Sequence, residues 1–297
     1  MLGQHGLNSG SDGRWRGMAV PTVRRRRLGT ELRRLREGSG LTLDEVEARS
    51  GISTSKVSRI ESATRGAKPG DVERLLDVYG LTDDGARDLL LKMARDGGRR
   101  GWWQTYDLSP AYSDLISMES DASSVRTYEP LVIPGLFQTS AYARAVITAH
   151  SMTVSAEDVD ALVEVRVARQ AVLTKPDPLR LRAIIHEAAL LASVPGTGVM
   201  RDQLQRLLDV AAYPHVTIQV LPLDAELHPG GTGGFTALGF NQPGMEVVLL
   251  ENLESSLYVE EPANVARYTE AFERLTAAAL PFERSLSLIT RLKEKEK

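Results

Sequence analysis

The feature that most constrains the fold is a pair of short helical segments that meet at one glycine, within residues 41–61, LTLDEVEARSGISTSKVSRIE. Thr42 and Glu45 have the Thr-x-x-Glu spacing of a capping box, which predicts a helix start. Gly51 breaks that helix, and the chain restarts into a second one at Ser53. The two helices share an apolar seam, formed by Val46, Ile52, Val57 and Ile60.

Further helical segments flank this pair. Leucines recur at helical spacing from residue 28 to 35, and glycines at positions 38 and 40 end that segment. Residues 71–80 and 83–97 have the pattern of two more amphipathic helices. We therefore predict an all-α domain of five helices over residues 24–97, after a disordered extension over residues 1–23 and before a linker over residues 98–108.

The second helix of the pair also fits an enzyme motif. Ser53 to Lys56 match S-x-x-K, the serine–lysine pair of penicillin-recognising acyl enzymes. Such enzymes need S-D-N-like and K-T-G-like segments as well, and the sequence has neither. It also lacks a G-x-S-x-G elbow. A DNA-binding helix-turn-helix is therefore the better interpretation of this stretch.

In that interpretation the outward face of the second helix contacts bases in the major groove. Arg59 can bond O6 and N7 of a guanine together, and small hydroxyls can reach base edges. The predicted base-contacting residues are Thr54, Ser55, Ser58 and Arg59. Cations around the rim are placed where phosphates would run, namely Lys56, Arg65 and Lys68.

The charge of the chain is divided between its two parts. Residues 23–70 hold 12 Lys and Arg against 6 Asp and Glu, a net +6, whereas residues 71–297 carry −10. A basic module favours an anionic partner. The chain has no cysteine, which fits a reducing compartment. No segment has the ~18 consecutive apolar residues of a membrane span, so we expect a cytoplasmic protein without membrane contact.

Residues 28–62, LGTELRRLREGSGLTLDEVEARSGISTSKVSRIES, resemble the xenobiotic-response-element (XRE, Cro/phage-repressor) family of helix-turn-helix domains. The resemblance covers about residues 26–96. It implies an ion pair between Arg36 and Glu61 that also directs Arg36 at a DNA phosphate, whereas the alternative is an ordinary surface pair of little energetic value. We also predict a phosphate contact for Thr42.

Three positions depart from the pattern of that family. Leu43 stands where the family often has a phosphate-contacting glutamine, which removes one backbone contact. Glu47 replaces a small alanine, and Ser50 replaces a leucine near the turn. The last two departures bear on how closely the two helices pack.

The rest of the chain has a mixed pattern. Helical stretches recur at 110–121, 140–150, 155–173, 199–212, 262–278 and 283–295. Short β-like runs lie between them, at 179–187, 216–223, 234–240, 245–251 and 255–261. The last three runs have short connections, which predicts an antiparallel meander. We predict an α+β domain over residues 109–297 with one mixed or antiparallel sheet.

Residues 129–144, EPLVIPGLFQTSAYAR, are the most specific part of a second resemblance. Together with VEVRVARQ, LRAIIHEAAL and VTIQVLPL they resemble the carboxy-terminal domain of unknown function of WhiJ-like regulators of actinomycetes, over about residues 103–290. That resemblance implies a transcriptional regulator, often paired with a small partner protein.

The residues themselves leave two roles open in this domain. Pro134-Gly135 marks a turn, and Thr139 or Ser140 caps the next helix, so the motif is structural or forms a ligand site. Arg166, Arg169 and Gln170 share a helix face. They either bind an acidic partner or make salt bridges within the domain.

Catalytic patterns are incomplete. His186-Glu187 begins an H-E-x-x-H pattern, but Leu190 stands where the second metal ligand belongs. HPGGTGGF, residues 228–235, lacks the Lys-Ser/Thr ending of a P-loop and is expected to be a mobile loop or a lid. We predict no catalytic residue, no cofactor and no metal site, and hence no enzyme.

The leading hypothesis is a homodimeric transcriptional regulator. The helix over residues 53–62 lies in the major groove of a double-stranded DNA operator, and the second domain senses a small-molecule effector or a partner protein. The alternative is an antitoxin-like interaction protein that holds a small partner protein and autoregulates its own operon. An enzyme with a DNA-binding appendage would need a pocket with perturbed acid–base groups.

Overall fold

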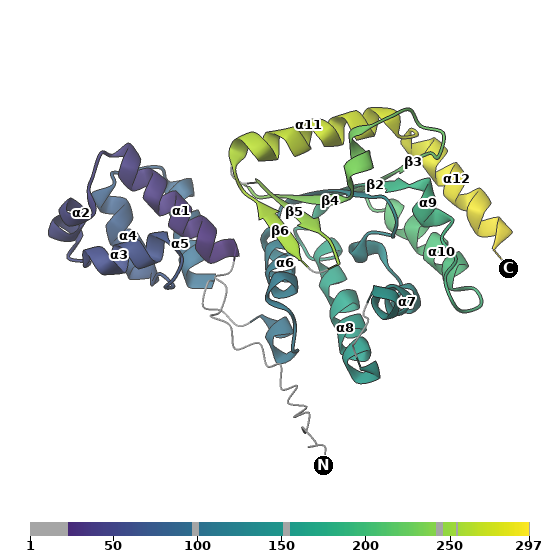
Figure 1. Cartoon of the computed structure of the whole chain (residues 1–297), viewed down its shortest axis with the longest axis horizontal. Coiled ribbons are helices and arrows are strands. Elements are labelled where there is room, and N and C mark those ends of the chain that lie inside the picture. Colours follow the sequence, from purple (N-terminus) through teal and green to yellow (C-terminus); the bar gives the residue numbers. More distant parts are fainter. Residues whose placement is uncertain (1–22, 97–100, 151–154, 242–245, 254, 297) are drawn as a thin grey trace, which may run out of the picture.

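The computed structural model describes residues 23–96, 101–150, 155–241, 246–253 and 255–296, and folds them into two domains (Figure 1). The predicted all-α domain followed by an α+β domain is confirmed. The extension predicted over residues 1–23 lies outside the described residues except for Val23.

The amino-terminal domain is a bundle of five helices around one apolar core. The core includes Leu32, Val46, Val57 and Leu75, each with no exposed surface. The helices are α1 (Val23–Gly38), α2 (Leu43–Ser50), α3 (Thr54–Glu61), α4 (Pro69–Val78) and α5 (Asp84–Asp96).

A six-stranded mixed sheet forms the second domain, in the order β3-β2-β1-β4-β5-β6. Pairing is parallel among β1, β2 and β3 and antiparallel from β1 through β4 and β5 to β6. Central β1 places Tyr128 between Ile184 and Phe235 of its two neighbours. The strands are β1 (Ser124–Glu129), β2 (Arg180–His186), β3 (Val216–Leu221), β4 (Phe235–Gly239), β5 (Glu246–Glu251) and β6 (Ser256–Val259).

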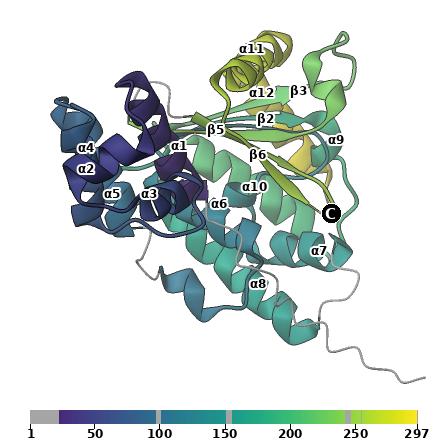
Figure 2. The ribbon, with the colours of Figure 1, turned by 60° about the vertical axis from the view of Figure 1, so that its left-hand side comes forward.

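Helices cover both faces of this sheet (Figures 1 and 2). Along β2, Ile184 points into a cluster with α11, whereas Ala183 and Ile185 point into a larger cluster with α10 and α12. Such alternation is expected where successive residues of a strand face opposite layers. The helices of this domain are α6 (Pro110–Asp121), α7 (Ser140–His150), α8 (Ala156–Ala168), α9 (Glu187–Leu190), α10 (Val199–Ala211), α11 (Pro262–Ala278) and α12 (Phe282–Lys295).

Some elements of this domain were predicted from the sequence pattern, and one of its strands was not. The antiparallel meander is confirmed as β4, β5 and β6. The helix predicted to end at residue 173 ends at Ala168, and a 3-10 segment, η3 (Arg169–Leu173), continues it. Strand β1, SVRTYE, was not predicted, although it joins the parallel and antiparallel halves of the sheet.

The two domains meet at the first turns of α1. The Arg26 Nε lies 3.8 Å from the Glu260 Oε1, and the Arg27 guanidinium lies 5.5 Å from the centre of the Phe240 ring. Burial lowers the pKa of Arg27, against the effect of Glu260 and other carboxylates. In the described part of the predicted linker, Trp102–Thr105 form a 3-10 segment, η1.

No helix within the described ranges has the length and the apolar character that crossing a bilayer requires.

Candidate nucleic-acid interface

The turn between α2 and α3 is held by hydrogen bonds as well as by its glycine. Gly51 adopts φ +68°, the left-handed region that suits glycine, and its N–H donates to the Glu47 carbonyl. The Glu47 carboxylate accepts a hydrogen bond of 2.7 Å from the Thr54 N–H at the start of α3. The Ser50 hydroxyl accepts one of 3.1 Å from the Ile52 N–H. The departures at positions 47 and 50 therefore supply contacts that fix this turn.

The predicted apolar seam and capping box are both present. Thr42 and Glu45 make the reciprocal hydrogen bonds of the box at the start of α2. The seam residues are exposed by at most 2 %, and they are Val46, Ile52, Val57 and Ile60. The packed side of α3 is thereby defined, and the opposite side is left for solvent.

The side of α3 away from the core carries the predicted base-contacting residues. Ser55, Ser58 and Arg59 are exposed, and Thr54 is half-buried. The Arg59 Nε donates a hydrogen bond of 3.0 Å to the Ser55 carbonyl, so its guanidinium lies along the surface of α3. This arrangement gives one cation and three hydroxyls on one exposed helical face.

Arg36 and Glu61 join α1 to the last residue of α3. The Arg36 Nε and Nη2 donate to the two Glu61 carboxylate oxygens at 2.8 and 2.9 Å, and Nη1 donates to the Leu41 carbonyl at 3.0 Å. The two side chains are only 13 % and 6 % exposed, so this pair is more sheltered than a surface ion pair. Its hydrogen bond to Glu61 raises the pKa of Arg36. A phosphate contact by Arg36 remains a prediction.

Gly29 lets α1 lie directly against the end of α3. A Cβ at this position would be 2.5 Å from the Glu61 carbonyl oxygen and 2.6 Å from that of Ile60. Both atoms belong to the backbone and cannot rotate away. Any larger residue here would displace α3 from α1.

Lys56 has a structural partner that the sequence analysis did not foresee. Its Nζ lies 2.8 Å from the Asp71 Oδ2, and the Arg74 Nη2 donates to the Asp71 Oδ1 at 2.9 Å. Burial acts to raise the pKa of Asp71, but the two cations outweigh it and hold the pKa below its ordinary value. The predicted phosphate contact of Lys56 would have to coexist with this salt bridge between α3 and α4.

The other predicted phosphate-contacting residues lie at the surface. Arg65 and Lys68 are exposed in the loop between α3 and α4, with Lys68 directly before Pro69 of that helix. Thr42 is exposed, and its hydroxyl also donates to the Glu45 carboxylate at 2.9 Å. These residues therefore lie at the start of α2 and in the loop that joins α3 to α4.

Comparison with known families assigns both domains. A family described as a helix-turn-helix domain matches residues 27–90, which contain α1 to α4 nearly complete. A second family, the domain of unknown function DUF5753, matches residues 112–291, more than half of the chain. The chain belongs to the DUF5753 family. The DUF5753 match runs from within α6 to within α12 and includes the whole sheet. No curated protein and no solved structure matches the chain.

Proposed function

We propose that this DUF5753 protein is a sequence-specific transcriptional regulator that inserts α3 into the major groove of DNA. The observation that supports this most directly is how α3 is fixed. Gly29 lets α1 lie against the end of α3, and the Arg36–Glu61 pair joins the two helices. Ser55, Ser58 and Arg59 remain exposed on the other side of α3. A rigid helix with an exposed polar face is what major-groove recognition requires.

Charge supports the same proposal. The net +6 of residues 23–70 favours association with a polyanion, and exposed Arg65 and Lys68 lie in the loop between α3 and α4. In this arrangement Arg59 reads a base, whereas Arg65 and Lys68 set the position of the domain on the phosphates.

We further propose that the domain is of the XRE type and that the whole chain is a WhiJ-like regulator of an actinomycete. The sheltered Arg36–Glu61 pair supports the first assignment, since the XRE resemblance implied that pair. A homodimer with two-fold symmetry would place two copies of α3 ~34 Å apart on one face of the duplex. We assign dimerisation and signal reception to the second domain.

The first experiment is a selection from a randomised duplex library with the full-length chain, followed by fluorescence anisotropy. We expect one enriched sequence, bound at least ~1,000-fold more tightly than a scrambled duplex, with affinity that falls as salt rises from ~50 to ~200 mM. Equal affinity for the enriched and scrambled duplexes would contradict sequence-specific regulation.

The decisive variant is Arg59→Ala, compared with Arg274→Ala on α11 of the second domain as a matched control. Loss of a guanine contact should cost ~1–3 kcal/mol of binding free energy and relax the base preference at one position. The control should bind as the parent chain does. An unchanged base preference in Arg59→Ala would remove Arg59 from the recognition surface.

A further inference from the structure

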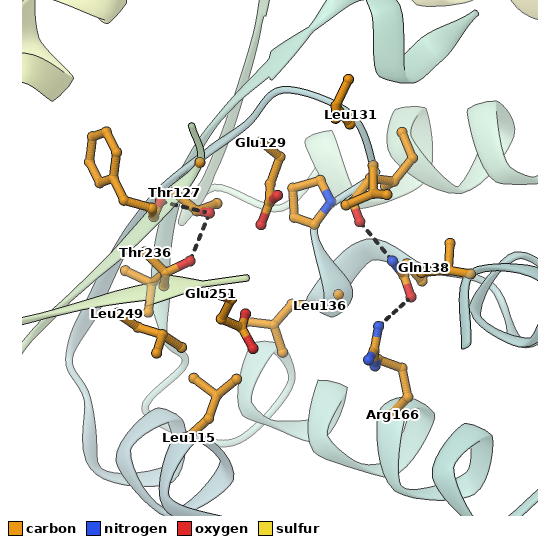
Figure 3. A pocket seen from close by; sticks show the side chains of 18 of the residues that line it. Leu115, Thr127, Glu129, Leu131, Leu136, Gln138, Arg166, Thr236, Leu249 and Glu251 are labelled. Carbon is orange, nitrogen blue, oxygen red and sulfur yellow. Dashed lines mark hydrogen bonds between the residues drawn. The ribbon is translucent and has the colours of Figure 1, made fainter. Parts of the chain in front are cut away.

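The second domain contains a cavity of about 610 Å³ at the carboxyl end of β1 (Figure 3). Its walls come from β1, the segment after it over residues 130–138, helix α6, helix α8 and the ends of β4 and β5. The E-P-x-x-x-P-G-L-x-Q motif singled out in the sequence contributes nine of its ten residues to this lining, among them Glu129, Gly135 and Gln138. That motif is therefore both structural and part of a cavity wall.

Two buried charged side chains in this cavity have atoms without a hydrogen-bond partner among the described residues. Arg169 is 7 % exposed and Glu119 is 4 % exposed, and both line the cavity. The Arg169 Nη1 lies 3.6 Å from the Glu119 Oε2, too far for a hydrogen bond. Within the described residues, neither atom nor the Arg169 Nε has a hydrogen-bond partner. Unsatisfied buried charges are costly, so a group that bonds to both would stabilise the site.

Arg166 is anchored, in contrast to Arg169. It donates to the Tyr112 hydroxyl at 3.2 Å and to the Gln138 side-chain oxygen at 3.0 Å. Both guanidiniums also lie near the Tyr112 ring, and a Cβ at Gly135 would overlap the Arg169 Nη2. Of the two roles left open for Arg166 and Arg169, Arg169 makes a salt bridge within the domain, to Glu119, and both arginines also line the cavity.

Carboxylates of the cavity come from the sheet side as well as from α6. Glu129 at the end of β1 and Glu251 at the end of β5 project into the space that Arg166 and Gln138 border from the other side (Figure 3). Gly234 lies so close that a Cβ there would be 3.5 Å from the Glu129 Oε2. The cavity thus has two cationic and three carboxyl groups around one space.

Apolar side chains form much of the remaining wall, beside neutral polar ones such as Thr127 and Thr236. Leu115, Ile133 and Leu249 form buried parts of its wall. Leu131 and Leu253 also line it and are 72 % and 70 % exposed, which places two large apolar side chains at its solvent-facing edge. An apolar cavity with a few convergent polar groups is the usual form of a small-molecule site.

We propose that this cavity binds a small zwitterion of amino-acid or dipeptide size with an apolar side chain. Its carboxylate pairs with Arg169, its ammonium lies among Glu119, Glu129 and Glu251, and its side chain packs on the leucines. A purely anionic ligand would face three carboxyl groups, and a purely cationic one would leave Arg169 unsatisfied. A ligand that carries both charges gives Arg169 a carboxylate partner and gives the three carboxyl groups an ammonium partner.

The charge state of Glu129 fits an ammonium ligand. Burial and then the neighbouring Glu251 raise the pKa of Glu129 to about 8, although Arg166, Arg169 and a hydrogen bond with Thr127 act to lower it. Glu129 therefore holds a proton at neutral pH when the cavity is empty. A bound ammonium stabilises the carboxylate form, so binding at pH 7 should release a proton.

The site stands on its own geometry, and only its effect on DNA rests on the proposed function. Strand β4 places Thr236 in the cavity wall, and four residues later Phe240, directly after that strand, contacts Arg27 of α1. Strand β4 therefore connects the cavity wall directly to the contact between the two domains. We infer that the zwitterion is the signal that adjusts the placement of the helix-turn-helix domain.

The test is thermal denaturation of the full-length chain without DNA, with L-leucine, L-phenylalanine and leucyl-leucine as probes. We expect at least one probe to raise the midpoint by about 5 °C or more near saturation. N-acetyl-leucine, which lacks the ammonium, and leucinamide, which lacks the carboxylate, should give less than a fifth of that shift. No shift with any zwitterion, or an equal shift with a single-charge analogue, would overturn the proposal.

Variants separate the site from general stability. Glu129→Gln keeps the shape and the neutral charge of the empty cavity, and Glu251→Gln changes an exposed side chain at its edge. Each should fold and weaken binding of the active probe at least tenfold, whereas Glu270→Gln on α11 should not. Calorimetry in phosphate and Tris at pH 7 should show proton release on binding by the parent chain and by Glu270→Gln, but not by Glu129→Gln. Parent-like binding by both cavity variants would refute the assignment, independently of any DNA measurement.

Discussion

The helix-turn-helix domain and the cavity of the second domain differ in how closely their charged side chains are paired. At α3, Arg36 and Lys56 have close carboxylate partners, Glu61 at 2.8 Å and Asp71 at 2.8 Å. In the cavity, Arg169 and Glu119 approach each other only to 3.6 Å. A paired charge fixes one geometry, whereas an unsatisfied one favours whatever molecule completes it. The first domain is therefore built to be rigid before it meets its partner, and the second gains stability from a ligand.

Gly29→Ala gives the largest expected effect and tests that rigidity. Because the new Cβ would overlap two backbone oxygens of α3, we expect a loss of ~3 kcal/mol in the free energy of unfolding and loss of DNA binding. Chemical denaturation followed by circular dichroism measures it. Gly70→Ala is the matched control, since a Cβ there meets nothing within 4 Å and alanine favours the helix. Equal behaviour of the two variants would disprove the tight approach of α1 to α3.

Glu61→Gln should come next in size. The substitution removes the closest counter-charge of the sheltered Arg36 guanidinium, which should cost ~2–3 kcal/mol of stability. Glu37→Gln, at an exposed neighbour of Arg36, should cost less than ~0.5 kcal/mol. A double-mutant cycle with Arg36→Met measures the coupling. A coupling energy near zero would reduce the pair to a surface contact.

Glu129→Gln tests the charged groups of the cavity through the pH dependence of stability. The pKa of Glu129 is about 8 in the folded chain against an ordinary 4.5, so folding favours the protonated form. Its stabilising contribution is complete below pH ~4.5 and is lost as pH rises through 8. From pH 5.5 to 8, the parent chain should lose up to ~1 kcal/mol per pH unit relative to Glu129→Gln. Parallel stability curves in urea would show that Glu129 ionises in the ordinary way.

Lys68→Ala should have the smallest effect. Lys68 is exposed, so its removal should change the free energy of unfolding by less than ~0.5 kcal/mol. Binding to specific and scrambled DNA should weaken alike, and the slope of log affinity against log salt should fall by about 1. A change in base preference would instead place Lys68 among the specificity residues.

Sequence patterns predicted the parts of the fold that depend on nearby residues. The capping box, the turn at Gly51 and the β4–β6 meander follow from local spacing and short connections. Strand β1 was not predicted because only Val125, Thr127 and Tyr128 of its six residues are buried. Its pairing partners, β2 and β4, also lie more than 50 residues away in the sequence. Whether the sheet was mixed or antiparallel depended on that strand.

The candidate sites show the same limit. The Arg36–Glu61 pair was predicted from a family resemblance and not from residue spacing. The Lys56–Asp71 pair was not predicted, because the sequence does not show where α4 packs against α3. Cavity residues extend from Tyr112 to Leu253, so no window of sequence contains the site. Glu129 in that cavity is an acid–base group with a perturbed pKa, which the enzyme alternative required, and the absence of catalysis remains a prediction.

The central place of β1 also sets the order in which the chain can fold. The contacts of α1 to α5 are closed within about 70 residues, so that domain can form early during synthesis. Strand β1 waits for β2, some 50 residues on, and for β4, more than 100 residues on. The cavity walls therefore close only after Leu253 has left the ribosome, and a nascent chain acquires its DNA-binding domain well before the site that would govern it.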